Sequence, residues 1–568
     1  MLSPRVTDAL RFAGAVLVTG VAASLFAIVM RLGAHAVLTH GLHAADILVA
    51  FEHLSTPARL ALPALGGLLA GLVGLAAAHK AGGHGVAEIL EAVALGRGRI
   101  SLSTALWKAL GSFVAIVTGG SIGREGPILQ FGAAAADAVA RWSRLSEPRV
   151  RVLVAAGTAA GFTAAYNTPL AAILFVLEIV TGALTLDIVL PIVVATTLST
   201  VLTRLAVGGG PLYGLRTFAV RADAELLAFT ALGALAGLLG PAFLALLDAG
   251  SALVRRLSLP RPVAGALGGL GVGLIAVWRP EVAGNGYEAI QRLFDMRFAP
   301  SMLAVLLVAK AVATVSSVAS GSPGGVFTPS LFLGATLGGL LGAALDHLAP
   351  ALPHGPPGGY ALVGMAAMIA ATTHAPLMAS VLVFELSGDY AVVLPLLLAT
   401  TGATFVARRL RMDSVYTSEL RRRGIIWEGS LAERRARAVH ARDILAPDAP
   451  WLPPATPLAD ALALLENSRM RAVYVGTDPV RVLDLHTAKS LWLARLHDPT
   501  APLAATVGEV AAEVPVAHPD DSLLELRARF HEVDWGELPV VDPGPPSRLV
   551  GIVRRQSLLD ALERVLSR

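Results

Sequence analysis

Cysteine is absent from the 568 residues, which excludes disulfide bonds and thiolate metal sites. Charged residues make up only 15% of the chain and aromatic residues only 5%, while 55% of the residues are hydrophobic. This balance is too apolar for a soluble globular protein and indicates a polytopic membrane protein in contact with the lipid bilayer. The formal net charge is +4 without a basic arm, so nucleic acid is not an expected partner.

Uncharged stretches of helical length recur along most of the chain. The first, residues 12–30, precedes no small-residue cleavage site, so we interpret it as a retained membrane helix rather than a signal peptide. Many later stretches are interrupted by glycine or proline. Broken backbone is tolerated in a membrane where it is buried in protein or lines a cavity, and paired broken helices mark transporter sites. The later stretches are residues 60–78, 152–177, 188–203, 226–247, 262–278 and 391–407.

One interruption, residues 119–127, places Arg124 and Glu125 between uncharged apolar segments. A charged side chain at bilayer depth costs about 2.5–3.5 kcal/mol, so these two residues are expected to be functional or paired. The glycines lack Cβ atoms and Pro127 suits the first turn of a helix, so backbone amides can approach a ligand. The segment is therefore typical of an anion site at a helix N-terminus. An ordinary glycine turn with an Arg124–Glu125 ion pair is the alternative.

The apolar part of the chain repeats itself. A proline-led segment that ends in glutamate occurs twice, and a break containing glycine and proline precedes each copy at nearly the same spacing. Two such matches at one spacing indicate two related halves, about 1–215 and 222–420. The segments are residues 167–178 and 374–385, and the breaks are residues 123–127 and 324–329.

The composition changes after residue 407. Six arginines between residues 408 and 423 indicate a cytosolic end by the positive-inside tendency. From residue 441 onward, two units of strand, helix, strand, strand and helix resemble a pair of CBS domains. We therefore divide the chain into a membrane domain at 1–425, a basic linker at 426–440 and a cytosolic α/β pair at 441–568.

The two glycine-containing breaks carry a more specific resemblance. Gly-Arg-Glu-Gly-Pro at 123–127 and Gly-Gly-Val-Phe-Thr-Pro at 324–329 match two signature motifs of the CLC family of chloride channels and chloride/proton antiporters. The resemblance covers about 15–425. It implies an all-α polytopic membrane protein with an inverted repeat and broken helices, followed by the α/β CBS pair. It also implies a homodimer with one anion pathway per subunit, chloride or another small anion as the transported ion, no cofactor, and no enzymatic activity. The expected location is the cell (inner) membrane, with the CBS pair and both termini in the cytosol.

The resemblance also assigns roles to residues in the breaks. The amides of Val326 and Phe327 are expected to face a central anion, and those of Arg124, Glu125 and Gly126 to lie just outside it. Glu125 matches the gating glutamate of the family. A carboxylate can occupy the same amide-lined site as an anion, and protonation neutralises it and lets it swing away.

A second set of residues completes the expected anion path. Tyr416 matches the family tyrosine whose hydroxyl reaches the central anion from the cytosol, and an interfacial tyrosine is the alternative. The family's Gly-Ser-Gly-Ile-Pro motif corresponds here to a segment that starts Gly83, His84, Gly85, so histidine replaces serine. His84 either donates a ring N–H to the anion or points away from the path. Chloride is the favoured transported anion, and nitrate and fluoride are the alternatives.

Ile179 bears on the transport mechanism. Well-studied antiporters of the family carry a second glutamate at the position that follows Glu178, and this residue relays protons from the cytosol. Isoleucine carries no proton, so the sequence favours a passive channel gated by Glu125. A proton-coupled anion antiporter is the alternative, because some exchangers of the family are also thought to lack this acid. We interpret Glu178 and Glu385, which end the repeated segments, as structural residues that cap or pair at helix ends.

The sequence also bears on two other classes of membrane protein and on the ligand of the CBS pair. A cation transporter with CBS modules would need acidic residues at the breaks, where this chain places amides, and a non-transporting sensor would show no anion flux. Nucleotide binding by CBS pairs usually relies on Thr or Ser with a nearby Asp after the final strand. Residues 551–557 lack this acid, and residues 483–487 offer only a partial substitute. A dimerisation or docking platform is at least as well supported as a nucleotide site.

Overall fold

The chain forms two units in the computed structural model, a membrane unit at Met1–Trp427 and a C-terminal unit at Glu428–Arg568. The sequence-based boundary at residue 425 lies close to this division. Within the predicted linker, Leu431–Ala438 form helix α19, and residues 426–430 lie outside the described residues. The structure describes residues 4–78, 85–95, 99–182, 186–214, 218, 221–295, 298–348, 350, 353–423, 425, 431–447, 450–467, 472–476, 480–497, 506–533, 536–542 and 548–566.

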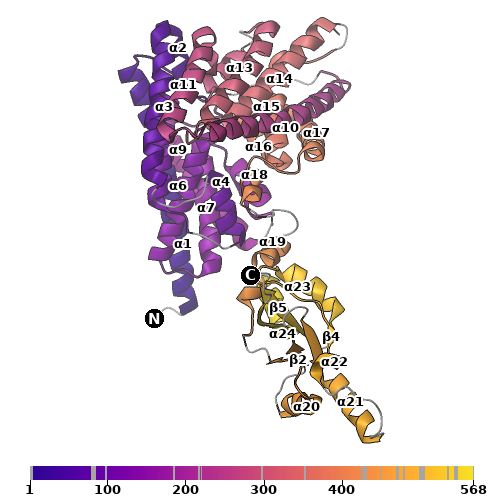
Figure 1. Ribbon diagram of the computed structural model, residues 1–568. Coiled ribbons are helices and arrows are strands. Elements are labelled where there is room, and N and C mark those ends of the chain that lie inside the picture. Colours follow the sequence, from indigo (N-terminus) through magenta and orange to yellow (C-terminus); the bar gives the residue numbers. More distant parts are fainter. Residues whose placement is uncertain are drawn as a thin grey trace. The chain divides into compact units, whose positions relative to one another are not determined.

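The first half of the membrane unit opens with a long helix that contains the whole predicted first span. This helix, α1, continues unbroken from Pro4 to Ala36, in agreement with a membrane helix (Figure 1). The other helices of this half are α2 (Ile47–His53), α3 (Thr56–Ala78), α4 (Gly85–Leu90), α5 (Leu102–Val117), α6 (Glu125–Trp142), α7 (Glu147–Tyr166), α8 (Pro169–Leu174) and α9 (Leu186–Val207). Three π-helical turns extend them, η1 (Val37–Gly41), η2 (Glu91–Leu95) and η3 (Phe175–Thr181).

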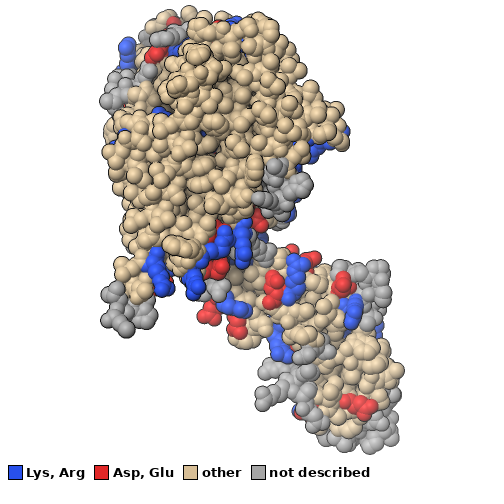
Figure 2. All heavy atoms as spheres, turned by 90° about the vertical axis from the view of Figure 1, so that its left-hand side faces the viewer, with Lys and Arg blue, Asp and Glu red and all other residues tan. Residues whose placement is uncertain are grey.

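The second half is also helical, and it holds many of the longest apolar helices. Eight helices of the described residues are long and apolar enough to cross a membrane. Figure 2 shows one side of the membrane unit as a broad surface with few charged residues, which suits contact with lipid. The helices of the second half are α10 (Glu225–Leu257), α11 (Arg261–Trp278), α12 (Tyr287–Phe294), α13 (Pro300–Ala319), α14 (Phe327–Leu348), α15 (Pro357–Thr373), α16 (Pro376–Ser387), α17 (Val393–Leu410) and α18 (Thr417–Arg422), with 3-10 turns η4 (Pro280–Val282) and η5 (Tyr390–Val392).

The repeated segments break the backbone in the same way in both halves. Helix α7 ends at Asn167 with φ 58°, and α15 ends at His374 with φ 60°, both left-handed. Each of these residues donates its N–H to the carbonyl four residues earlier, and a proline then starts the next helix, α8 or α16. A left-handed residue followed by proline ends a helix sharply. The two halves therefore share the backbone conformation of this break as well as its sequence.

Glycines allow the central helices of each half to touch. In the first half, a Cβ on Gly132 of α6 would lie 2.2 Å from the carbonyl oxygen of Gly157 in α7. In the second half, a Cβ on Gly334 of α14 would lie 2.2 Å from the carbonyl oxygen of Gly364 in α15. Small residues at helix crossings are typical of membrane proteins, where close packing replaces the hydrophobic effect. The crossings fix α6 and α14, the helices that begin at the two motifs.

The C-terminal unit consists of short strands and helices in two copies. Strand β2 (Ala472–Val475) pairs in parallel with β1 (Trp451–Leu452) and antiparallel with β3 (Arg481–Asp484). Strand β4 (Ala512–Glu513) joins β3, and Ala446 of the first copy pairs with Ile552 of the second, so the copies exchange backbone pairing. The remaining elements are β5 (Glu537–Asp542), β6 (Arg548–Arg554), α20 (Leu458–Asn467), α21 (Leu485–His497), α22 (Val507–Val510), α23 (Leu523–Arg529), α24 (Arg555–Leu566), η6 (Ala441–Asp443) and η7 (Phe530–Glu532).

Candidate functional site

The two signature loops meet at a pair of glycines. Gly123 donates its N–H to the carbonyl oxygen of Gly325 at 2.7 Å, and Gly325 returns an N–H to Gly123 at 2.9 Å. A Cβ would lie 2.1 Å from the Glu125 Oε1 atom if built on Gly123, and 2.4 Å if built on Gly325. Side chains are therefore excluded on both sides of the Glu125 carboxylate. The glycines join the halves and leave room for this one group.

Glu125 begins helix α6, and its carboxylate lies at the N-terminus of helix α14. Its Oε1 atom accepts the backbone N–H of Phe327 at 3.0 Å and that of Thr328 at 3.3 Å, and Oε2 accepts the Thr328 hydroxyl at 3.0 Å. Glu125 is only 3% exposed. The first amides of a helix have no partner within the helix and carry partial positive charge, so they suit a carboxylate or another anion. Thus two of the predicted residues, Glu125 and Phe327, are brought together.

The amides that hold the Glu125 carboxylate overlap by one residue with the pair expected at a central anion, and the position of that pair stays a prediction. The sequence analysis names the amides of Val326 and Phe327, whereas those that donate to Glu125 belong to Phe327 and Thr328. The Glu125 carboxylate lies on the amides of Phe327 and Thr328 because helix α14 starts at Phe327 and its first amides have no partner within the helix. Val326 precedes the helix, and its carbonyl oxygen accepts the N–H of Ser330 at 2.9 Å.

Thr328 connects Glu125 to two tyrosines that the sequence analysis did not identify. The Tyr166 hydroxyl lies 3.2 Å from the Thr328 Oγ1 atom, and the Tyr287 hydroxyl lies 3.4 Å from the same atom. Tyr166 ends α7 and Tyr287 begins α12, so these hydroxyls come from three separate elements. The available sequence signal was weak, consisting of tyrosines next to the Asn167 break and in a Gly-containing turn.

Arg124 does not form the ion pair with Glu125 that was the alternative reading of this loop. In the described part of the chain, its Nη2 atom donates to the Ala165 carbonyl oxygen at 3.4 Å, and its guanidinium lies 5.3 Å from the centre of the Tyr287 ring. Arg124 precedes α6, and neither of these contacts involves the Glu125 carboxylate, consistent with adjacent residues that do not face each other.

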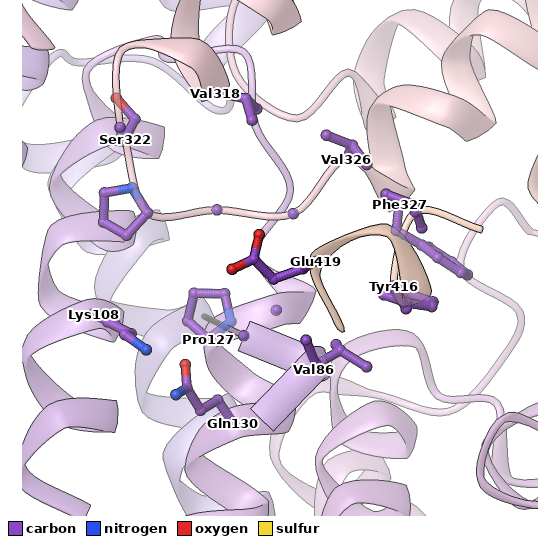
Figure 3. A pocket seen from close by; sticks show the side chains of 18 of the residues that line it. Val86, Lys108, Pro127, Gln130, Val318, Ser322, Val326, Phe327, Tyr416 and Glu419 are labelled. Carbon is purple, nitrogen blue, oxygen red and sulfur yellow. The ribbon is translucent and has the colours of Figure 1, made fainter. Parts of the chain in front are cut away.

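A cavity of about 660 Å³ borders the Glu125 carboxylate. Figure 3 shows Phe327 and Tyr416 on one side of it and Lys108 and Gln130 on the other. The Tyr416 ring packs edge-on against Phe175 with centroids 5.9 Å apart, and Tyr416 lines the same cavity as Glu125. Of the predicted site residues, those lining the cavity are Gly85, Glu125, Gly126, Val326, Phe327 and Tyr416, whereas Gly83 and His84 lie outside the described residues.

Charged side chains also border the cavity. From the second half, Asp248 accepts from Arg411 at 2.8 Å and also pairs with Arg422. From the first half, Glu88 accepts the Gln130 amide at 2.6 Å and lies 3.8 Å from Lys108, and both of these partners line the cavity. Basic groups on the walls favour anions, while their acidic partners limit that attraction. Groups of three or more His, Asp or Glu residues that could hold a metal are absent from the described ranges.

Glu178 and Glu385 cap each other's half of the membrane unit. The Glu385 carboxylate accepts the amides of Leu170 and Ala171 at the start of α8, at 3.0 and 2.7 Å. The Glu178 carboxylate accepts the amides of Leu377 and Met378 at the start of α16, at 3.3 and 2.8 Å. The prediction that both acids are structural is confirmed.

The C-terminal unit places one predicted acid next to its threonine. The Asp484 carboxylate accepts both the amide of Thr487, at 2.9 Å, and its hydroxyl, at 2.5 Å, which caps helix α21. Burial raises the pKa of Asp484, but these hydrogen bonds outweigh it and hold the pKa below its usual range. The two polar residues left for a ribose in the first copy are thus bonded to each other.

Comparison with known protein families finds two regions. Residues 66–408 match the voltage gated chloride channel family, and residues 507–564 match the CBS domain. The chain is 40% identical over 370 residues to a ClcB-like chloride channel protein of Ralstonia nicotianae, which covers 64% of this chain and 86% of that protein. It is 37% identical over 377 residues to the voltage-gated ClC-type chloride channel ClcB of Salmonella typhimurium, covering 65% and 88%.

Solved structures show the same fold. A slow cyanobacterial Cl−/H+ antiporter superposes with a TM-score of 0.66 at 25% identity, covering 74% of this chain and 99% of the other. A eukaryotic CLC transporter superposes with a TM-score of 0.62 at 22% identity and covers 96% of this chain and 98% of its own, which shows the fold alone. The predicted all-α membrane domain followed by an α/β CBS pair is therefore confirmed.

Proposed function

Because the chain belongs to the voltage gated chloride channel family, we propose that it is a chloride channel in which the Glu125 carboxylate is the gate. The observation that carries this proposal is the position of the carboxylate on the amides of Phe327 and Thr328. A chloride ion needs the same N–H donors that the carboxylate uses, so the two compete for one place.

The chemistry of the site suits passage rather than tight binding. Backbone amides and the hydroxyl of Thr328 are neutral donors, and a full positive charge at this depth would hold the anion too strongly for it to leave. Tyr416 and Phe327 border the cavity beside the carboxylate, so an anion that enters the cavity meets the same helix N-terminus. When Glu125 takes up a proton, it loses its attraction for the amides and vacates the place for chloride.

Passive flow is favoured over proton exchange by the residue after Glu178. Ile179 is 7% exposed and carries no ionisable group, so it provides no step for a proton. Proton-coupled antiport is the second candidate function, supported by the structural match to a protein described as a Cl−/H+ antiporter. Both candidates use Glu125, and they differ in whether protons move in exchange for the anion.

Flux in reconstituted vesicles with simultaneous recording of chloride and pH tests the proposal. A chloride gradient is expected to drive chloride release without uphill proton movement. Uphill proton movement driven by chloride would contradict the channel and support the antiporter. Glu125→Gln is expected to retain chloride flux but lose its pH dependence, and an unchanged pH dependence would remove Glu125 from the gate.

We also propose a homodimer in the cell (inner) membrane, with both termini and the CBS pair in the cytosol. The support is the family membership and the arginines that follow the last apolar helix, Arg408, Arg409 and Arg411. Cross-linking in native membranes tests the dimer. Protease access to the CBS pair in inside-out vesicles, compared with sealed cells, tests the orientation.

For the CBS pair, we propose a docking or dimerisation platform without a bound nucleotide. The support is the bonding of Asp484 to Thr487, which occupies the polar groups of the first copy. Titration of the full-length protein with ATP in a calorimeter is expected to give no binding heat. Saturable binding that Asp484→Asn abolishes would contradict this assignment.

A further inference from the structure

Behind the Glu125 carboxylate lies a cluster of three hydroxyls from Thr328, Tyr166 and Tyr287. The two phenol oxygens lie 3.2 and 3.4 Å from the Thr328 Oγ1 atom, which in turn lies 3.0 Å from the Glu125 Oε2 atom. Thr328 is 0%, Tyr166 1% and Tyr287 8% exposed. Because all three are buried, they are expected to satisfy one another rather than bulk water.

The number of hydroxyl protons in the cluster determines the direction of its hydrogen bonds. A threonine hydroxyl has one proton to donate and two lone pairs with which to accept. When Glu125 is ionised, Thr328 donates its proton to Oε2, and its lone pairs are left for Tyr166 and Tyr287. Both phenols can then donate toward Thr328, and its hydrogen-bonding capacity is fully used. The cluster is thus complete with a carboxylate at its end.

A protonated Glu125 does not fit the same cluster. Three donors already point at the carboxyl group, the amides of Phe327 and Thr328 and the Thr328 hydroxyl. The amides cannot turn. A proton on Oε2 requires Thr328 to accept instead of donate, and Thr328 can do so only if a phenol gives up its place and accepts in turn. The neutral acid therefore requires the hydroxyls to reverse, and it gives up the charge-assisted hydrogen bonds that the two amides and the Thr328 hydroxyl make to a carboxylate.

On the premise that Glu125 is the gate, we propose that Tyr166 and Tyr287 are positioning residues that fix the Thr328 hydroxyl as a donor to Glu125. They make the occluded position favourable for the ionised gate and unfavourable for the protonated gate. The phenols act through Thr328 and do not touch the carboxylate themselves. The cluster thereby makes release of the gate depend more strongly on protonation of Glu125.

Titratable and charged groups outside this cluster also lie near the gate. The titratable groups around Glu125 include three phenols, those of Tyr166 from α7, Tyr287 from α12 and Tyr416 before α18, and phenols are ordinarily neutral at physiological pH. Beyond Tyr287 lie further charges that also interact with one another, namely Arg31, Arg124, Glu288, Lys310 and Asp46. Glu288 is the carboxyl group in this set that interacts with Arg124 and Lys310, so a test must separate its titration from that of Glu125.

Chloride efflux from vesicles, measured across a pH series with the full-length protein, tests the proposal. Thr328→Val is expected to raise efflux at neutral pH and to move the midpoint of the pH dependence upward by about one unit, since loss of a hydrogen bond to a charged group corresponds to about tenfold. Tyr166→Phe and Tyr287→Phe are each expected to move it in the same direction by about half as much. All three shifts are expected to vanish in a Glu125→Ala background.

Matched variants control for general damage. Thr336→Val removes a hydroxyl from the same helix that bonds only to carbonyls of Phe332 and Leu333 among its described partners. Tyr360→Phe removes a phenol oxygen from a buried ring that stacks on Phe229, with centroids 4.6 Å apart. Both are expected to keep the wild-type midpoint.

The outcomes separate this inference from the gate itself. If Glu125→Ala changes the pH dependence but the three hydroxyl variants do not, the gate stands and the positioning role is overturned. Shifts that persist in Glu125→Ala would also overturn it, because they would arise from another group such as Glu288. If Glu125→Ala changes nothing, the proposed function fails first. Should Thr328→Val not fold, the two Tyr→Phe variants carry the test, because they keep the rings.

Discussion

The two halves of the membrane unit use equivalent loops for opposite purposes. Residues 123–127 and 325–329 correspond one to one, and helices α6 and α14 begin at the equivalent residues Glu125 and Phe327. The first half places a carboxylate at this position, whereas the second places a phenyl ring and leaves its amides to a partner. One copy of the loop thus supplies the donors and the other supplies the group that occupies them.

Away from this point the halves remain alike. Asn167 and His374 end equivalent helices in the same left-handed conformation, and Glu178 and Glu385 cap each other's half with two amide bonds each. The scaffold is therefore symmetric and the site is not. The difference between the halves lies in the side chains of one pair of loops and leaves the helix ends and their caps alike.

The largest effect is expected from a variant that removes the room for the carboxylate. A Cβ on Gly325 would lie 2.4 Å from the Glu125 Oε1 atom, so Gly325→Ala is expected to force the gate out of its place. Overpacking of this kind costs about 1–3 kcal/mol, which corresponds to roughly ten- to hundredfold more chloride efflux at neutral pH and a flattened pH dependence.

The control lies in the neighbouring position of the other loop. A Cβ on Gly126 would lie 3.7 Å from the Gly325 nitrogen, which is ordinary van der Waals contact. Gly126→Ala is therefore expected to keep the pH dependence of efflux. A Gly325→Ala protein that folds and shows wild-type pH dependence would contradict the view that this glycine makes room for the gate.

The next largest effect is expected at the two glutamate caps, and it tests whether the two halves are equally stabilised. Glu178→Gln and Glu385→Gln each turn an amide NH2 group toward a backbone N–H, so each is expected to lower the free energy of unfolding by about 1–3 kcal/mol. Melting temperatures of the purified variants should fall by similar amounts, while the exposed Glu147→Gln should have little effect. A large fall for one variant only would show that the two caps are unequal.

Sequence reading located the loops and the breaks because glycine, proline and charge are conspicuous in apolar sequence. The pair Arg124 and Glu125 could be singled out for that reason, and the matching breaks revealed the repeat. The roles of Tyr166 and Tyr287 could not be read in this way. Both are acceptable in a buried apolar helix, and their approach to Thr328 depends on three elements that are distant in sequence.

The charges at the cavity extend the comparison between halves to a smaller effect. Asp248 of the second half compensates two arginines, Arg411 and Arg422, whereas Glu88 of the first half has Lys108 as its basic partner. Asp248→Asn is expected to raise chloride flux by about two- to threefold at low ionic strength, because two positive charges are exposed to the cavity. Glu88→Gln is expected to raise it less.

Salt provides the measurement that identifies the cause. Flux through both variants should approach the wild-type value as ionic strength rises, since mobile ions screen partly exposed charges. Asp413→Asn is the matched control, because Asp413 pairs with Arg421 at 2.7 Å and neither is among the described residues that line the cavity. An increase that persists at high salt would indicate a change of shape instead of charge.

The smallest effect concerns the second repeat of the molecule, the CBS pair, where one copy carries a cap that the other lacks. Asp484 caps α21, and its hydrogen bonds from Thr487 lower its pKa although burial raises it, whereas the segment after β6 carries Arg554 and Ser557 instead. A carboxyl with a lowered pKa stabilises the fold above its unfolded-state pKa, and this contribution disappears as the pH falls through its folded-state value. Asp484→Asn is therefore expected to speed hydrogen exchange of α21 at neutral pH and to match the wild type only in acid, once the pH lies below the lowered folded-state pKa of Asp484. A difference of equal size at both pH values would mean that the side chain acts by shape and not by charge.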